Sequence, residues 1–126
     1  MKTTILTGLL LLCTHPLFAQ VQASTRTITV EVTNSWNKDK TDAPVVLSLK
    51  DLSSGFRVRS AVVMNGNAEI PSQLDDLNGD LNADELAFVM DIPARSKQTL
   101  TVTLSSVKTD KSYPARVFAE MLIRDA

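Results

Sequence analysis

The residues with the clearest chemical potential lie in an acidic run at residues 75–85, where oxygen-bearing side chains recur at every second position. A tight loop with this spacing can turn several oxygens toward one centre. Calcium takes six to eight hard oxygen ligands, and the short side chains of Asp and Asn can supply them. The spacing therefore predicts a candidate calcium site with these ligands: Asp76, Asn78, Asp80, Asn82 and Asp84.

The acidic run departs from the EF-hand pattern at two positions. Counted from Asp76, the sixth residue is Leu81, where an EF-hand has Gly, and the twelfth is Ala87, where it has a bidentate Glu. We therefore do not expect an EF-hand. Two other interpretations stay open: a solvated turn, because Asp and Asn bond their own backbone, and a carboxylate pair for acid–base work as in a glycosidase. The carboxylate pair needs a cleft, which a single hairpin does not supply.

A second candidate is the single tryptophan, Trp36, in a polar stretch at residues 34–43. An exposed Trp on a loop can stack on the face of a sugar, so Trp36 is a candidate glycan-stacking residue, although packing in the core or at a hinge is the commoner role of such a ring. Arg57 and Arg59 are expected to share the outward face of one strand. They could meet an acidic polymer there, but a solvated strand face explains them as well.

The amino-terminal residues have the features of a secretory signal peptide. Lys2 precedes an apolar run at residues 5–13, which is shorter than the roughly 20 apolar residues of a membrane-spanning helix. Small residues suited to cleavage stand at Ala19 and Ala23. We therefore expect a signal peptide at residues 1–19, with cleavage as late as residue 23, no membrane span, and export to the periplasm or the extracellular space.

Removal of the signal peptide also removes much possible chemistry. The single His and the single Cys of the chain, His15 and Cys13, both lie in it. The remaining chain cannot hold a Cys nucleophile, a Ser-His-Asp triad or a zinc site made of Cys and His. Its 12 basic residues against 14 acidic ones argue against a nucleic-acid partner. We therefore predict no catalytic residue and no cofactor other than calcium for this chain alone.

Around these candidates, apolar residues alternate with polar ones at the period of half-buried β-strands. The alternating stretches cover residues 27–33, 45–50, 56–63, 86–92 and 99–104, and turn signals such as Asn65-Gly66 separate them. Short strands at roughly ten-residue intervals predict an all-β fold, an antiparallel immunoglobulin-like β-sandwich of six to seven strands at residues 24–107. We expect residues 108–126 to form a final strand or to start a further segment of a truncated chain.

The order of these features resembles the amino-terminal part of a secreted family known as domain of unknown function 4861. The resemblance rests on ITVEVTN, DAPVVL, IPSQLDDLNGD, DELAF and IPA, which begin at residues 28, 42, 70, 84 and 92. It implies a link to bacterial polysaccharide utilisation, and it implies that any carbohydrate-active centre lies beyond residue 126. Leu81 departs from the Gly that usually follows the Asp of such loops.

Three functions follow as expectations. The first is a non-catalytic β-sandwich module of an exported protein linked to polysaccharide degradation, with a glycan as its partner. The second is the front part of a glycoside hydrolase or polysaccharide lyase whose active site lies beyond this chain. The third is a surface adhesion-type domain that calcium stabilises.

Overall fold

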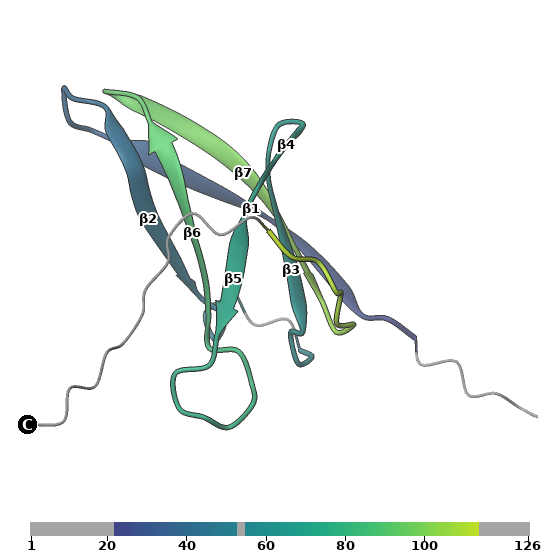
Figure 1. The fold of residues 1–126 in the computed structure, drawn as a ribbon. Helices are drawn as coiled ribbons and strands as arrows, with labels where there is room; N and C mark the ends of the chain where they lie inside the picture. Colours follow the sequence, from purple (N-terminus) through teal and green to yellow (C-terminus); the bar gives the residue numbers. More distant parts are fainter. Residues whose placement is uncertain (1–21, 53–54, 114–126) are drawn as a thin grey trace, which may run out of the picture.

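The structure, a computed structural model, describes residues 22–52 and 55–113. The expected signal peptide and the apolar stretch at residues 116–123 lie outside these ranges. The described residues contain no helix, so none that could cross a membrane. They form seven strands (Figure 1): β1 Thr25–Asn34, β2 Lys40–Ser48, β3 Ser60–Asn65, β4 Ala68–Ile70, β5 Ser72–Asp75, β6 Glu85–Ile92 and β7 Ser96–Ser105.

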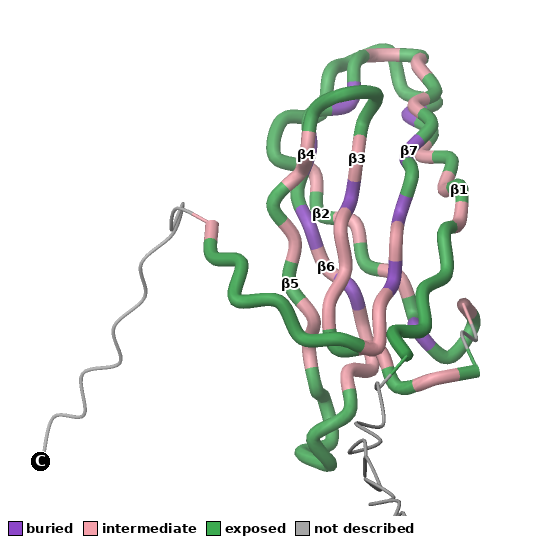
Figure 2. The backbone as a smooth tube through the Cα atoms, turned by 90° about the vertical axis from the view of Figure 1, so that its right-hand side faces the viewer, coloured by how far each residue is buried: buried purple, intermediate pink, exposed green. Residues whose placement is uncertain are grey.

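The strands make two antiparallel sheets that face each other, which confirms the predicted β-sandwich. One sheet has the order β1-β7-β3-β4 and the other the order β2-β6-β5. Figure 2 shows β4, β3, β7 and β1 side by side in front of the second sheet. The first and last strands pair along their whole length, from Thr25 opposite Ser105 to Asn34 opposite Ser96.

The core lies between the sheets and is built from alternate residues of each strand. The predicted inward faces of β1, β2, β6 and β7 are confirmed: every second residue in them is less exposed than its neighbours. Full burial of one such aliphatic side chain contributes roughly 1.5–3 kcal/mol. The buried core residues are Leu49, Val63, Leu86, Phe88, Met90, Ile92, Leu100, Val102 and Leu104.

The prediction of one strand through residues 56–63 is wrong. β3 begins only at Ser60, and it turns Ala61 and Val63 toward the core. Phe56 and Val58 also pack against the core, but from the irregular segment before the strand. The spacing of inward residues therefore shifts by one between Val58 and Ala61. A single regular strand alternates with a period of two and cannot turn both sets to one face.

Candidate functional site

The two candidate sites lie at opposite ends of the sandwich, as Figure 1 shows. The β5–β6 hairpin carries the acidic loop, residues 76–84, at one end, and the β1–β2 connection carries Trp36 at the other. Asp75 pairs with Glu85 at the base of the hairpin. The backbone N–H of Asp84 also donates to the carbonyl of Asp75 at 2.7 Å, so the base is closed.

In the acidic loop, the Asp76 carboxylate organises the backbone. Its Oδ1 accepts the N–H of Gly79 at 2.7 Å and its Oδ2 accepts the N–H of Leu81 at 2.7 Å. Asn78 Oδ1 accepts the N–H of Asp80 at 2.8 Å. These are the turns that short Asp and Asn side chains form with the residues that follow them. Three of the five predicted calcium ligands therefore lie in one hydrogen-bonded loop.

The remaining predicted ligands join the same loop. Asp80 Oδ1 accepts the backbone N–H of Asn82 at 2.7 Å, and Asp84 Oδ2 accepts the N–H of Leu77 at 2.8 Å. The hydrogen bonds from Asn82 lower the pKa of the Asp80 carboxyl, with smaller help from Asn78 and from the charge of Arg57. Asp80 is therefore an ionised carboxylate at neutral pH.

Two observations bear on calcium. No three acidic side chains gather as a metal site within residues 22–52 and 55–113. On the other hand, Leu81 has a φ of 68°, so it takes the sharp turn for which an EF-hand uses Gly at the sixth position. Asp76 Oδ1 accepts the N–H groups of both Asn78 and Gly79, whereas the other ligand oxygens that cap an N–H keep a second lone pair. The donor chemistry suits calcium, and binding stays a prediction.

At the other end, the Trp36 ring is displayed on an ordered loop. The ring is 67% exposed, and Lys40 Nζ lies 5.5 Å from its centroid. The backbone of Trp36 is held on both sides: its N–H donates to Asn34 Oδ1 at 3.1 Å, and its carbonyl accepts the N–H of Arg95 at 2.8 Å. Trp36 does not pack in the core, so the core-packing role considered for it is wrong.

Asn34 was missed by the sequence-based reasoning, and it explains why this loop is ordered. The side chain is only 1% exposed. Its Nδ2 lies within hydrogen-bond distance of the carbonyl oxygens of Lys38, Ile92 and Pro93, at 2.8, 3.1 and 3.0 Å. One amide therefore ties the β1–β2 loop to the end of β6. An Asn at the end of an apolar alternation was the available signal.

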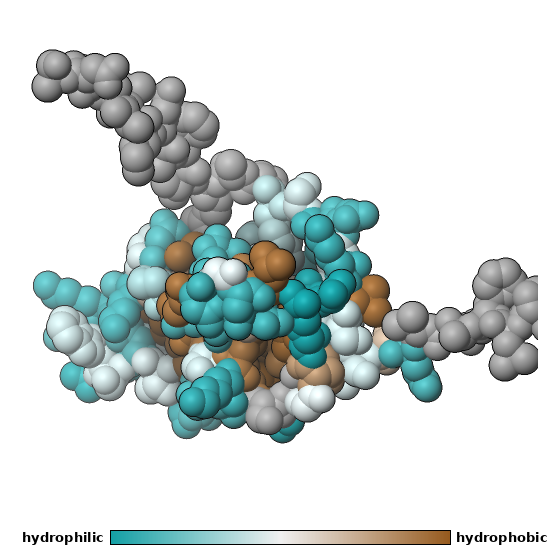
Figure 3. Space-filling view, turned by 90° about the horizontal axis from the view of Figure 1, so that it is seen from below, coloured by the Kyte–Doolittle hydropathy of each residue, from teal (hydrophilic) through white to brown (hydrophobic). Residues whose placement is uncertain are grey.

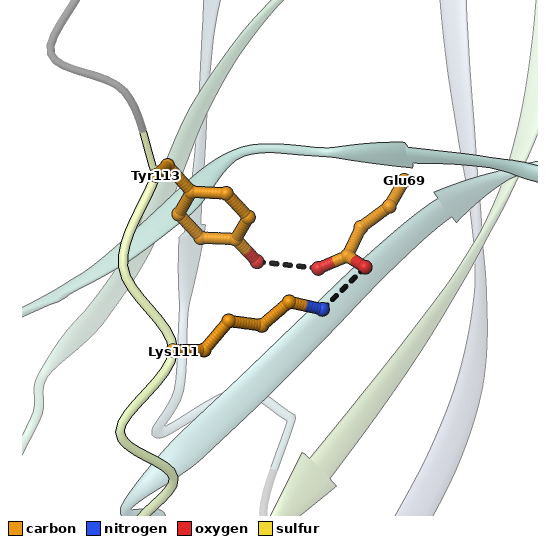
Figure 4. A network of polar contacts seen from close by, with 3 residues as sticks. All are labelled: Glu69, Lys111 and Tyr113. Atoms are coloured by element: carbon orange, nitrogen blue, oxygen red, sulfur yellow. Dashed lines mark hydrogen bonds and ion pairs between the residues drawn. The ribbon is translucent and has the colours of Figure 1, made fainter.

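A third polar cluster joins β4 to the C-terminal strap, which we define as residues 106–113. Figure 4 shows Lys111 and Tyr113 of the strap pointing toward Glu69. Lys111 forms an ion pair with Glu69, and the Tyr113 hydroxyl donates to Glu69 Oε1 at 2.5 Å. The bonds from Lys111 and then Tyr113 lower the pKa of Glu69, whereas burial and then Glu69 raise that of Tyr113. Tyr113 thus stays protonated and is a poor general base.

Comparison with known proteins gives a match to a sequence family. The model of the family described as "Domain of unknown function (DUF4861)" matches residues 32–126 of this chain. This range includes the acidic loop, Trp36 and six of the seven strands in full. No curated protein matches the chain.

Proposed function

For this chain, which belongs to the family known as domain of unknown function 4861, we propose a role as a non-catalytic glycan-binding module of an exported protein that degrades polysaccharide. The observation that carries the proposal is the exposed Trp36 ring on its fixed loop. A fixed ring loses little conformational freedom when a ligand binds. The apolar face of a sugar ring would cover apolar surface that water now contacts.

The contacts around Trp36 support a sugar rather than an apolar partner. The ammonium of Lys40 lies over one face of the ring, so a sugar would stack on the other. The same ammonium makes the surroundings of the ring polar, which disfavours an apolar partner because burying an unpaired charge is costly. Asp39, whose Oδ1 accepts the N–H of Ala94 at 2.7 Å, places an acceptor in the same loop.

The test is affinity electrophoresis of the exported chain in gels that contain soluble polysaccharides, one polysaccharide per gel. A polysaccharide that retards the native chain should no longer retard Trp36→Ala. Val46→Ala is the matched control, because Val46 is also an exposed apolar residue but lies in β2 outside the loop. Equal retardation of the native chain and Trp36→Ala would contradict the proposal.

The second candidate function is calcium stabilisation of the acidic loop, favoured by the Leu81 turn at the sixth position. A bound cation would offset the repulsion between the loop carboxylates. It would stabilise the fold by about 2.7 kcal/mol when free calcium is a hundredfold above its dissociation constant. For extracellular modules that constant lies at about 10⁻⁴–10⁻³ M.

Melting curves in millimolar CaCl₂ and in EDTA test the calcium candidate. Calcium should raise the melting temperature of the native chain, and Asp80→Ala should remove most of the gain. Asp110→Ala is the control: it removes the same charge from the exposed strap, and calcium should still raise its melting temperature. If the melting curves with and without calcium overlay, the acidic loop does not bind calcium and is a plain turn.

If this chain is instead the front part of a hydrolase or lyase, the chain alone should release no product from plant-type polysaccharides.

A further inference from the structure

A cavity of about 320 Å³ opens between the acidic loop, the segment before β3 and the start of the strap. Its volume lies at the small end of the range for ligand pockets, about 300–1,000 Å³. Three cationic side chains line it: Arg57, Arg59 and Lys108. Figure 3 looks onto this end of the molecule, where apolar side chains show between hydrophilic ones.

The three cations are available to an anion. Within residues 22–52 and 55–113, the ion pairs are Lys97 with Glu31 and Lys111 with Glu69, so none of the three takes part in one. Arg57 Nη2 donates to the carbonyl of Leu81, which holds the guanidinium against the acidic loop. A guanidinium has five N–H donors, so most of them remain for a ligand.

The segments that carry the cations are anchored by the sheet. The backbone N–H of Arg59 donates to the carbonyl of Ser105 at 2.8 Å, so the residue before β3 is tied to the end of β7. Ser60 Oγ donates to the carbonyl of Val107 at 2.7 Å, beside Lys108. Arginine on a fixed backbone suits the planar, bidentate recognition of a carboxylate.

The rest of the lining sets the ligand class. Asp76 and Asn82 also line the cavity. The carboxylate can accept hydrogen bonds from hydroxyls, and the amide can both accept from them and donate to them. Leu74, Val58 and Ala83 supply an apolar wall for C–H groups. Asp76 also disfavours a compact, highly charged anion, because like charges repel. A ligand with one carboxylate, several hydroxyls and an apolar face complements the cations, the polar groups and the apolar wall of the cavity.

We propose that this cavity binds a uronic acid residue of an acidic glycan, with Arg57, Arg59 and Lys108 around the carboxylate. The site is independent of Trp36, because the β1–β2 connection that carries Trp36 lies at the opposite end of the sandwich (Figure 1). It therefore does not rest on the function proposed above. Loss of either site by mutation should leave the other intact.

The test uses trigalacturonate as the probe and isothermal titration calorimetry with the exported chain. Trigalacturonate should bind, and its fully methyl-esterified form, which has the same sugars without the charge, should not. Arg59→Ala should weaken binding by about tenfold or more, because a hydrogen bond to a charged group is lost. Arg59→Lys keeps the charge but not the planar guanidinium, so it should lose only part of the affinity. This conservative variant also tests whether the loss in Arg59→Ala comes from misfolding.

The matched control is Lys38→Ala, which removes one exposed cation from the Trp36 loop and should leave the affinity unchanged. Equal binding of the esterified probe would mean that the cavity does not recognise a carboxylate. Inorganic sulfate that competes as well as trigalacturonate would mean that the cavity does not recognise a sugar. Either result would overturn the proposal. Loss of binding in Trp36→Ala with full binding in Arg59→Ala would place the acidic glycan at the other end of the molecule and overturn the proposal.

Discussion

At the scale of single residues, Leu81 is held in a conformation that its side chain disfavours. Its φ is 68° and its side chain is 79% exposed, so little packing compensates. The left-handed conformation costs a non-Gly residue roughly 1–2 kcal/mol, whereas Gly adds about 0.5–1 kcal/mol of chain entropy in the unfolded state. Leu81→Gly should therefore raise the free energy of unfolding by about 0.5–1 kcal/mol, as measured by urea denaturation.

Leu77→Gly is the control for this substitution. Leu77 lies in the same loop and is 66% exposed, but it does not have a positive φ. Glycine there adds chain entropy without relieving strain, so it should lower the stability slightly. If both variants change stability in the same direction, Leu81 is not the strained residue of the loop.

The loss of Asn34 should be felt at the end of the sandwich where β1 and β6 both finish. Asn34→Ala leaves the carbonyls of Lys38, Ile92 and Pro93 without this donor. An unsatisfied buried polar group costs about 1–3 kcal/mol, so we expect a loss of about 2–3 kcal/mol in chemical denaturation.

The exposed Asn65 offers a comparison for Asn34. Its Nδ2 donates to Gln98 Oε1 at 2.8 Å on the surface, where water can replace the bond. Asn65→Ala should therefore cost less than about 1 kcal/mol. A similar cost for both variants would mean that the buried amide of Asn34 does not order its loop.

At the scale of elements, the C-terminal strap should respond to acid. Lys111 and Tyr113 hold the pKa of Glu69 below its ordinary value of 4.5. A lowered pKa means that these contacts contribute stability above pH 4.5 and lose it as the pH falls through the folded value. Acidification should release residues 111–113 from β4 while the core stays folded, and the Tyr113 ring resonances in NMR should follow that titration.

The same cluster should also respond to high pH. The pKa of Tyr113 lies above its ordinary value of 10.0, so the unfolded chain ionises first and stability falls as the pH rises past that value. Glu69→Gln removes the titrating carboxylate and should flatten the acid response of Tyr113. A Tyr113 titration that persists in Glu69→Gln would assign the acid response to another group.

The strands also show how well the alternation of apolar and polar residues predicts which residues face the core. In β1, β2, β6 and β7 one sheet face is buried, so a period of two in the sequence predicted the inward residues correctly. β5 is too short for such a pattern, and the shift before β3 breaks it. The turns of the acidic loop are local, and the Asp and Asn residues themselves indicate them.

Contacts between distant residues could not be predicted in this way. Glu69 meets Lys111 and Tyr113 across 42 and 44 positions of the chain. Arg59 and Lys108 line one cavity because β3 and β7 are neighbours in the sheet, which no local pattern shows. Only the strand order brings these groups together.

At the scale of the whole molecule, one core holds both sheets. Leu86 of β6 is fully buried and pairs with Leu47 of β2 and Leu74 of β5. Leu86→Ala should cost about 2–5 kcal/mol, because it leaves a cavity between the sheets. Both sheets should unfold in one transition, as small single domains do. Urea denaturation followed by circular dichroism measures this, with Val46→Ala, exposed on β2, as the neutral comparison.

The pairing of β1 with β7 has a mechanical consequence. Ser24 and Ser106 lie together where the chain enters and leaves the sandwich, since the N–H of Ser106 donates to the carbonyl of Ser24 at 2.9 Å. A pulling force on these two points would load the ladder at Thr25 and Ser105 first and open it one bond at a time, because the bonds run perpendicular to the strands. We expect the sandwich to unzip at low force in optical tweezers rather than to resist shear.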